Sequence, residues 1–260
     1  MFVCLSIIVV LCVLGGAVFV VSDIQIERQD KNLQQSTISD ESIIEKSRIE
    51  YNKSIFAISE SKVVTNIESN FPTIRVVGIE RKFPNKIVIK LTERVPLVAL
   101  KFKDKPEYLI IDNNMCVIDN VKEKDERLEK LTIVDGYELS SVNNVSYGKQ
   151  LPASLGQEVV VINHIMAGLQ QKMDVTQIND LVKGVHFIKK SNVVYVSTKY
   201  GDKGLVIKID YTEMKDNKEL VFNHIQLAYD AYVKLDTEQK QSGYLIYDEK
   251  YKTYKYSVRI

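Results

Sequence analysis

The side chains most able to carry catalysis or hold a metal ion are three histidines. His164 and His224 lie on segments with helical periodicity, and His186 lies beside a strand-like segment. None has the HExxH spacing of a zinc protease, and no cysteine stands near any of them. The pattern therefore predicts surface or hydrogen-bonded core histidines rather than a metal site.

Motifs for nucleophiles and phosphates are missing from the sequence as well. It contains no GxSxG, GxxxxGK[ST] or GxGxxG segment, and residues 201–204 (GDKG) have the chemistry of a hairpin turn. Asp112 and Asp119 stand among turn residues, where aspartate forms local hydrogen bonds. The sequence thus predicts no enzyme and no cofactor, and leaves open only a hydrolase built on an unrecognised pair of carboxylates.

Cysteine usage gives no structural or metal-binding framework. Cys4 and Cys12 lie in an apolar N-terminal run, and Cys116 stands alone in the rest of the chain. No disulfide can therefore form within the large domain, and no cysteine–histidine cluster suggests zinc. The formal net charge of +1 gives no general attraction to nucleic acid, and 45% hydrophobic with 27% charged residues is a globular composition.

The N-terminal run is long enough to cross a membrane. Phe2 to Val21 contains no charged residue, and twenty residues at about 1.5 Å each span roughly 30 Å. A cleaved signal peptide is the alternative, although nothing basic precedes the apolar core. Arg28 and Lys31, which follow the apolar run, slightly favour a cytoplasmic location for the large part of the chain. Large domains are nevertheless translocated across membranes largely independently of such charges. Charge therefore leaves the orientation open.

The elements of the first region follow from its periodicity. A strand is expected at Asp23–Ile26, a helix from the cap Ser39, and a second helix from Ser59 that Pro72 ends. Two further strands, Thr73–Glu80 and Ile87–Thr92, are joined by turn residues 82–85. The expected core is Val63, Val64, Ile67, Ile74, Ile87, Ile89 and Leu91. Two helices on one face of a three-stranded sheet would bury these residues.

The second region has more strand than helix, and the expected fold class of the whole chain is α+β. A solvated helix or loop is expected for the charged residues 122–130. Helices are expected at Gln157–Lys172 and Asn217–Leu235. The expected strands are Glu107–Asp112, Met115–Ile118, Leu131–Val134, Val193–Thr198, Gly204–Ile209, Gly243–Asp248 and Tyr251–Ile260.

Tyrosines crowd the C-terminus, at 244, 247, 251, 254 and 256. Along the last strand Tyr254 and Tyr256 share one face, and Lys255 and Arg259 share the other. One interpretation is a strand that packs its aromatic face and uses lysine to discourage aggregation. The other is an interface, since tyrosine and arginine are frequent at binding hot spots. Both can hold at once, if one face packs while the backbone edge stays open.

Four segments of the first region stand out as motifs: Ile55–Ile58, Ile67 to Pro72, Arg81–Ile89 (RKFPNKIVI) and Glu93–Pro96 (ERVP). Through these residues the first region resembles the POTRA domain of the FtsQ/DivIB bacterial cell-division proteins. The following Tyr108–Asp112 is similar to the opening of that family's second, β-rich domain. The resemblance implies an anchor at 1–22, a POTRA domain at 23–102 and a β domain at 103–260.

The resemblance also implies a function. Family members are non-enzymatic single-pass proteins of the plasma (inner) membrane, with an extracytoplasmic bulk concentrated at the division septum. They bind the small coiled-coil proteins FtsB or DivIC, and FtsL, by strand addition, and so influence septal peptidoglycan synthesis. The partner contact is accordingly expected at Tyr244, Ile246, Tyr247, Tyr254, Lys255, Tyr256 and Arg259.

Two further interpretations stay open at this point. Glu93 and Arg94 are expected to be solvated at a strand end where Pro96 bends the chain, with a contact surface as the alternative. For the whole chain, the alternative function is a membrane-tethered POTRA module for protein assembly or secretion in the envelope.

Overall fold

The computed structural model describes residues 18–30, 38–103, 105–139, 145–201, 203–215, 217 and 219–258. They form two compact units, which are described separately. The first runs to Arg94 and includes residues 147–149; the second comprises the rest from Val95 on. The expected boundary at 102/103 differs from this division, because strand β4 (Pro96–Phe102) pairs within the sheet of the second unit.

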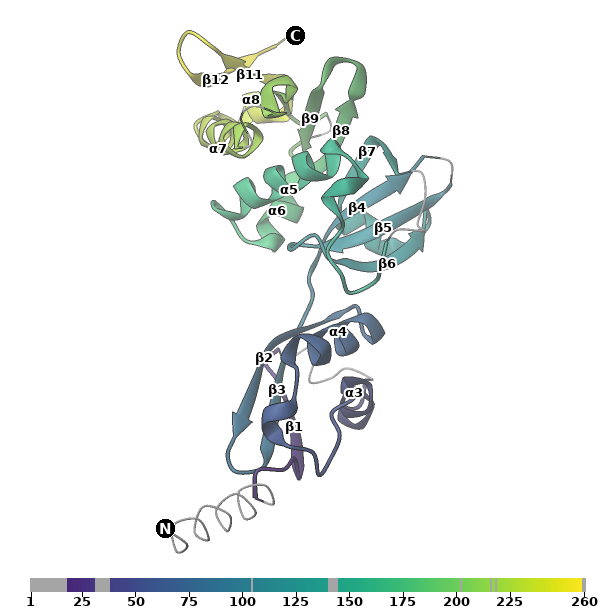
Figure 1. Cartoon of the computed structure of the whole chain (residues 1–260). Helices are drawn as coiled ribbons and strands as arrows, with labels where there is room; N and C mark the ends of the chain where they lie inside the picture. Colours follow the sequence, from purple (N-terminus) through teal and green to yellow (C-terminus); the bar gives the residue numbers. More distant parts are fainter. Residues whose placement is uncertain are drawn as a thin grey trace, which may run out of the picture. The chain divides into compact units, whose positions relative to one another are not determined.

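The first unit is a three-stranded sheet with two helices on one face (Figure 1). The sheet order is β1-β3-β2, with β1 parallel and β2 antiparallel to the central strand. Its elements are β1 (Asp23–Arg28), α3 (Asp40–Ser47), the 3₁₀ turn η1 (Ile55–Ala57), α4 (Glu60–Asn70), β2 (Ile74–Lys82) and β3 (Lys86–Glu93). The expected order strand, helix, helix, strand, strand is present.

Local sequence explains how these elements begin and pack. The Ser39 side chain accepts a hydrogen bond from the Ser42 amide and so caps α3. Of the seven expected core residues, six are buried, while Val64 is only half-buried because it stands beside the inward stripe of Val63 and Ile67. Side chains of this size each contribute about 1.5–3 kcal/mol when fully buried.

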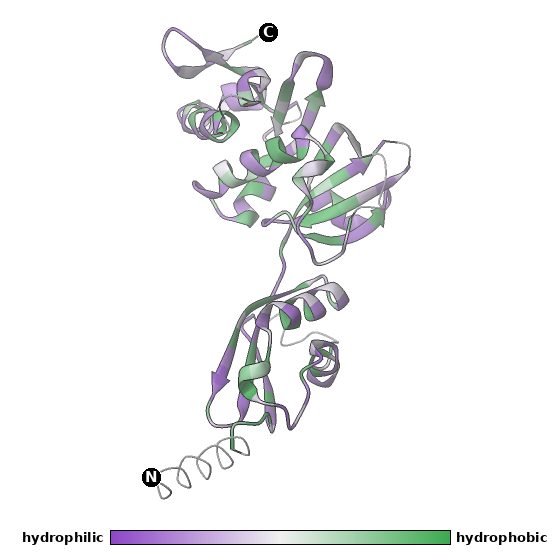
Figure 2. Cartoon of the chain, in the orientation of Figure 1, coloured by the Kyte–Doolittle hydropathy of each residue, from purple (hydrophilic) through white to green (hydrophobic). Residues whose placement is uncertain are grey.

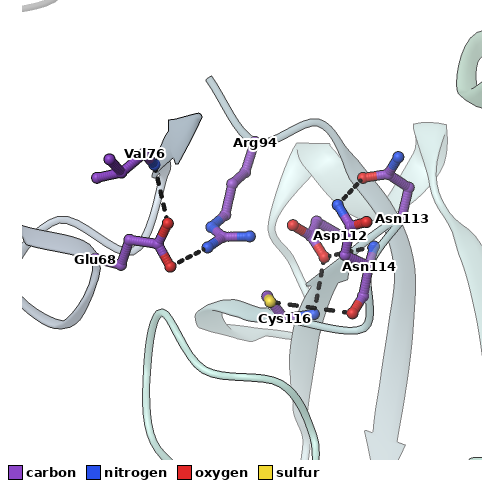
Figure 3. A network of polar contacts seen from close by, with 7 residues as sticks. All are labelled: Glu68, Val76, Arg94, Asp112, Asn113, Asn114 and Cys116. Carbon is purple, nitrogen blue, oxygen red and sulfur yellow. Dashed lines mark hydrogen bonds and ion pairs between the residues drawn. The ribbon is translucent and has the colours of Figure 1, made fainter. Parts of the chain in front are cut away.

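Arg94 corrects the expectation of a solvated strand end. The residue is 5% exposed, and its guanidinium lies 2.7 Å from Glu68 of α4 (Figure 3). The other oxygen of the Glu68 carboxylate accepts a hydrogen bond from the Val76 amide at 2.9 Å. Glu68 thus joins α4 to the start of β2 and to the end of β3, and Arg94 is a structural residue of the first unit.

The end of the expected membrane anchor also belongs to this unit. Val21 is fully buried, and Phe19 packs against the same core. The remainder of the expected anchor, residues 1–17, lies outside the described residues. Within the part of the chain that the structure describes, no helix has the length and apolar character needed to cross a bilayer.

The second unit is built on a nine-stranded sheet in the order β12-β11-β10-β9-β8-β7-β4-β5-β6. Beside β4, its strands are β5 (Glu107–Asp112), β6 (Val117–Lys122), β7 (Thr132–Leu139), β8 (Val182–Ile188), β9 (Val193–Thr198), β10 (Val206–Asp210), β11 (Tyr244–Asp248) and β12 (Thr253–Ser257). Hydrophobic residues (green in Figure 2) are concentrated on β4 and β5, whereas the turn between β11 and β12 is hydrophilic. Strands β12 and β6 are the two ends of this sheet. With the helices of both units, the chain has the expected α+β class.

Helices cover one face of this sheet and enclose the main core. They are α5 (Gln157–Gln170), α6 (Val175–Leu181) and α7 (Leu220–Val233). The unit also contains helix α8 (Thr237–Gln241) and short 3₁₀ turns at Glu126–Lys130, Ala153–Leu155, Lys189–Ser191 and Thr212–Lys215. Gly168 lets α5 and α7 approach closely, since a Cβ there would lie 2.3 Å from Ile225. The charged residues 122–130 end in a 3₁₀ turn, as expected.

The turn after β5 confirms the expected role of Asp112. Its Oδ1 accepts hydrogen bonds from the amides of Asn114 and Cys116, both at 2.8 Å (Figure 3). These bonds close the tight turn between β5 and β6, so Asp112 acts in local structure.

Candidate partner-binding edge

The C-terminal hairpin forms one end of the large sheet. Strand β11 pairs in parallel with β10, and β12 pairs antiparallel with β11. Among the described residues β12 has no second neighbouring strand, so one of its backbone edges is not paired by the sheet. The last two residues, Arg259 and Ile260, lie outside the described residues, and so does the expected contact of Arg259.

Local chemistry sets the position of this hairpin. Asp236 and Gln239 form a capping box that begins α8. Gly243 then enters β11 with φ +102°, where a Cβ would lie 2.9 Å from the Ser257 carbonyl oxygen. At the far turn Asp248 Oδ1 accepts hydrogen bonds from the amides of Lys250 and Tyr251. The hairpin is therefore fixed at both of its ends.

The expected contact residues divide between two faces of the hairpin. One face packs on α7 and the core: Leu245 and Tyr254 are buried, and Tyr247 and Tyr256 are partly buried against the same cluster. The opposite face carries Tyr244, Ile246 and Lys255, which are half-buried or exposed. Strand alternation accounts for this division, since Tyr247 faces Tyr254 and Ile246 faces Lys255 across the ladder.

The packed face contains an aromatic cluster around His224 of α7. The His224 ring lies 4.3 Å from the Tyr247 ring and 5.8 Å from the Tyr254 ring, between centroids. His224 Nδ1 and the Tyr254 hydroxyl are 3.0 Å apart and hydrogen-bonded. Burial lowers the pKa of His224 against the opposing charges of Glu249 and Asp210, and burial raises the pKa of Tyr254. Both groups are thus favoured in their neutral forms.

The open face contains a charged group. The Lys255 ammonium lies 2.8 Å from Asp248 Oδ2 and 3.6 Å from the centre of the Tyr251 ring. The hydrogen bond from Lys255 holds the pKa of Asp248 below its usual value. Lys208 of β10 lies on the same face, because its neighbours Ile207 and Ile209 point into the core. Two lysines therefore flank the half-buried Ile246.

No metal centre is present in the described part of the chain, where no three histidine, cysteine or acidic residues gather closely enough to hold an ion. His164 is partly buried in α5, and burial lowers its pKa. His186 lies 2.5 Å from Asp135 on the exposed side of β7 and β8. The three histidines thus stand at separate places in the described part of the chain.

Comparisons with known proteins match parts of the chain. Residues 33–94 match the family model of the FtsQ-type POTRA domain. The chain is 44% identical to the cell division protein DivIB of Clostridium tetani over 110 residues, which is 41% of this chain and 38% of that protein. It is 31% identical to DivIB of Clostridium botulinum over 159 residues, 61% of this chain and 56% of that protein. The matches thus span about two fifths to just over half of the length of these relatives.

Proposed function

We propose that this protein is a member of the FtsQ/DivIB family of bacterial cell-division proteins, and that it is a non-enzymatic scaffold of the division machinery that binds a partner strand along β12. The observation that carries the proposal is the position of β12 at the end of the nine-stranded sheet. The partners are small coiled-coil division proteins of the FtsB or DivIC type, and of the FtsL type. Binding them would influence septal peptidoglycan synthesis.

The hairpin suits strand addition for a physical reason. Its inner face is held on the core by Tyr254 and Leu245, so the edge is already ordered before a partner arrives. A partner strand would complete the backbone hydrogen bonds of β12, each contributing about 0.5–1.5 kcal/mol. Preorganisation of this kind lowers the entropic cost of binding.

The open face indicates which side chains such a strand would carry. Ile246 and Tyr244 offer apolar area, and Lys255 and Lys208 offer positive charge beside it. A partner segment with apolar residues next to acidic ones would match this surface. Tyr247, Tyr254 and Tyr256 would then act by supporting the strand from its packed face, and Arg259 would extend the basic side.

The location in the cell is part of the same proposal. The apolar run that starts at Phe2 would anchor the chain in the plasma membrane as a single pass, with both units outside the cytoplasm and concentrated at the septum. With Phe19 and Val21 in the core of the first unit, roughly 17 apolar residues are left for the span, within the usual range.

A charge reversal tests the assignment of the edge. Lys255→Glu is expected to weaken binding of the DivIC- or FtsB-type protein of the same bacterium about tenfold, or ~1.4 kcal/mol. The matched control is Lys122→Glu, an exposed lysine of β6 at the opposite end of the same sheet. Affinity is measured by calorimetry, and thermal unfolding checks that both variants are folded. Equal affinities of the two folded variants would argue against β12.

A further inference from the structure

Three phenylalanine rings gather at one end of the first unit. Phe19, Phe56 and Phe83 lie with their ring centroids 5.6–5.9 Å apart. Phe56 is 62% exposed and Phe83 is 59% exposed, although together they form one apolar surface. An exposed apolar cluster of this kind marks an interaction surface more often than a single exposed side chain does.

Hydrogen bonds and an ion pair hold the segments that carry this cluster in place. Phe83 lies at the tip of the β2–β3 hairpin, and Phe56 lies in η1, 27 residues earlier in the chain. The Arg81 guanidinium holds these segments together by donating to the Ile55 carbonyl at 3.2 Å and to the Ile58 carbonyl at 3.0 Å. It also forms an ion pair with Glu60. The two rings are therefore presented side by side on a fixed support.

The path of the chain leads directly to this cluster. The Val21 amide donates to the Lys53 carbonyl, and the Ile55 amide donates to the Phe19 carbonyl, both at 2.9 Å. On the other side, the Ser22 amide donates to the Asn85 carbonyl at 2.9 Å. Residues 19–22 are thus held between the loop that carries Phe56 and the turn that carries Phe83. The uncharged apolar run of residues 2–17 joins the unit at this point.

We propose that Phe19, Phe56 and Phe83 form a seat that rests on the surface of the lipid bilayer, with the two exposed rings inserted among the acyl chains. The inference rests on the proposed membrane anchoring by the apolar run. That run ends at the seat, so anchoring would bring the rings to the membrane surface. Aromatic rings are favoured at this depth, and exposed Lys53 and Lys82 beside them can reach the headgroups.

The seat gives the anchored unit a defined orientation. A single helix joined to a folded unit would otherwise leave that unit free to tilt over the membrane. Two inserted rings and the chain entry between them make a contact of more than one point, which restricts this tilt. The seat would thus set the first unit with the far end of β2 pointing away from the membrane.

The absence of tryptophan from the sequence gives a direct test. Phe83→Trp places one tryptophan in the seat, and Phe56→Trp serves as a second probe. The matched control is Thr73→Trp, an exposed position just before β2 and about 30 Å away along an extended strand. The full chain is reconstituted into vesicles of plain phospholipid or of phospholipid brominated on its acyl chains. Tryptophan emission is then compared between the two kinds of vesicle.

The seat predicts loss of emission in brominated vesicles, with a shift to shorter wavelength, for the tryptophans at 83 and 56 but not at 73. Carbonate washing of the vesicles tests the anchoring of the chain separately from the insertion of the rings. If the chain resists washing but both seat probes keep their full emission, the membrane contact of the seat is contradicted and the anchor is not. The exposed rings would then be assigned to a partner protein. A chain that washing strips from the vesicles overturns the anchor and the seat together.

Discussion

Tyr254→Ala is expected to lower the free energy of unfolding of the second unit by about 3–5 kcal/mol, as large aromatic-to-alanine changes in cores do. The ring is 4% exposed and packs against Tyr247 and His224. The variant would lose these contacts and leave a cavity beneath the edge strand. Denaturant unfolding, followed by hydrogen exchange of peptides from the hairpin, measures the loss.

Two companion variants show where the effect arises. Tyr254→Phe keeps the ring but removes the hydroxyl bonded to His224, and is expected to cost about 1 kcal/mol. Tyr251→Ala removes a tyrosine of the same hairpin that is 58% exposed, and little change is expected. Equal stabilities of Tyr254→Ala and Tyr251→Ala would mean that the hairpin does not pack on α7 as described. If Tyr254→Ala also loses partner binding, the stability of the variant decides whether the cause is an unfolded hairpin or a lost contact.

The second large effect is expected in the first unit. Glu68→Ala should lower the free energy of unfolding of this unit by about 3–5 kcal/mol, the usual cost of removing one member of a buried ion pair. The Glu68 side chain is 13% exposed and that of Arg94 is 2% exposed. The substitution also removes the acceptor of the Val76 amide. Hydrogen exchange of peptides from α4, β2 and β3 under increasing urea reports the change for this unit alone.

Glu50→Ala provides the matched control. Glu50 lies 3.7 Å from Lys53 in the same unit, but both side chains are about 70% exposed, so water screens their attraction. The control is expected to unfold as the unsubstituted protein does. A Glu68→Ala variant as stable as the control would show that Arg94 needs no carboxylate from α4.

Hydrophobic periodicity and turn chemistry predicted most elements of the first unit. Ser39, Ser59 and Pro72 stand next to helix ends, and the alternation of β3 marked its buried face. The pairing of Arg94 with Glu68 could not be predicted in this way. Periodicity places residues on the faces of one element, whereas this contact joins residues 26 positions apart on different elements.

In the second unit, helix α6 and strands β4 and β8 were not expected. Helix α6 and strand β8 follow directly on each other, and no long apolar pattern separates them from α5. A signal was nevertheless present, because Asp174 and Gln177 have the spacing of a capping box and form one. Strand β4 was not expected as a strand, and its residues fell within the expected POTRA domain, since Pro96 indicated the end of a strand although it begins one.

For the candidate edge, the sequence predicted the two faces of the last strand and offered packing of the aromatic face as one of two interpretations. Alternation placed Tyr254 and Tyr256 opposite Lys255, as the structure has them. Which face packs depends on α7, whose His224 meets the hairpin from a segment 30 residues earlier. The parallel pairing of β11 with β10 also depends on how the intervening helices cross, and no local pattern specifies it.

Hydrogen exchange of the complex tests strand addition at β12 most directly. The full chain, in a membrane or detergent, is compared alone and saturated with the proposed partner, the DivIC- or FtsB-type protein of the same bacterium. We predict slower amide exchange in Thr253–Ser257 on binding, because a partner strand would accept hydrogen bonds from the open edge. Strand β6, at the other end of the sheet, should exchange as before. A stable complex in which residues 253–257 exchange as fast as in the free protein, while another surface becomes protected, would contradict the account.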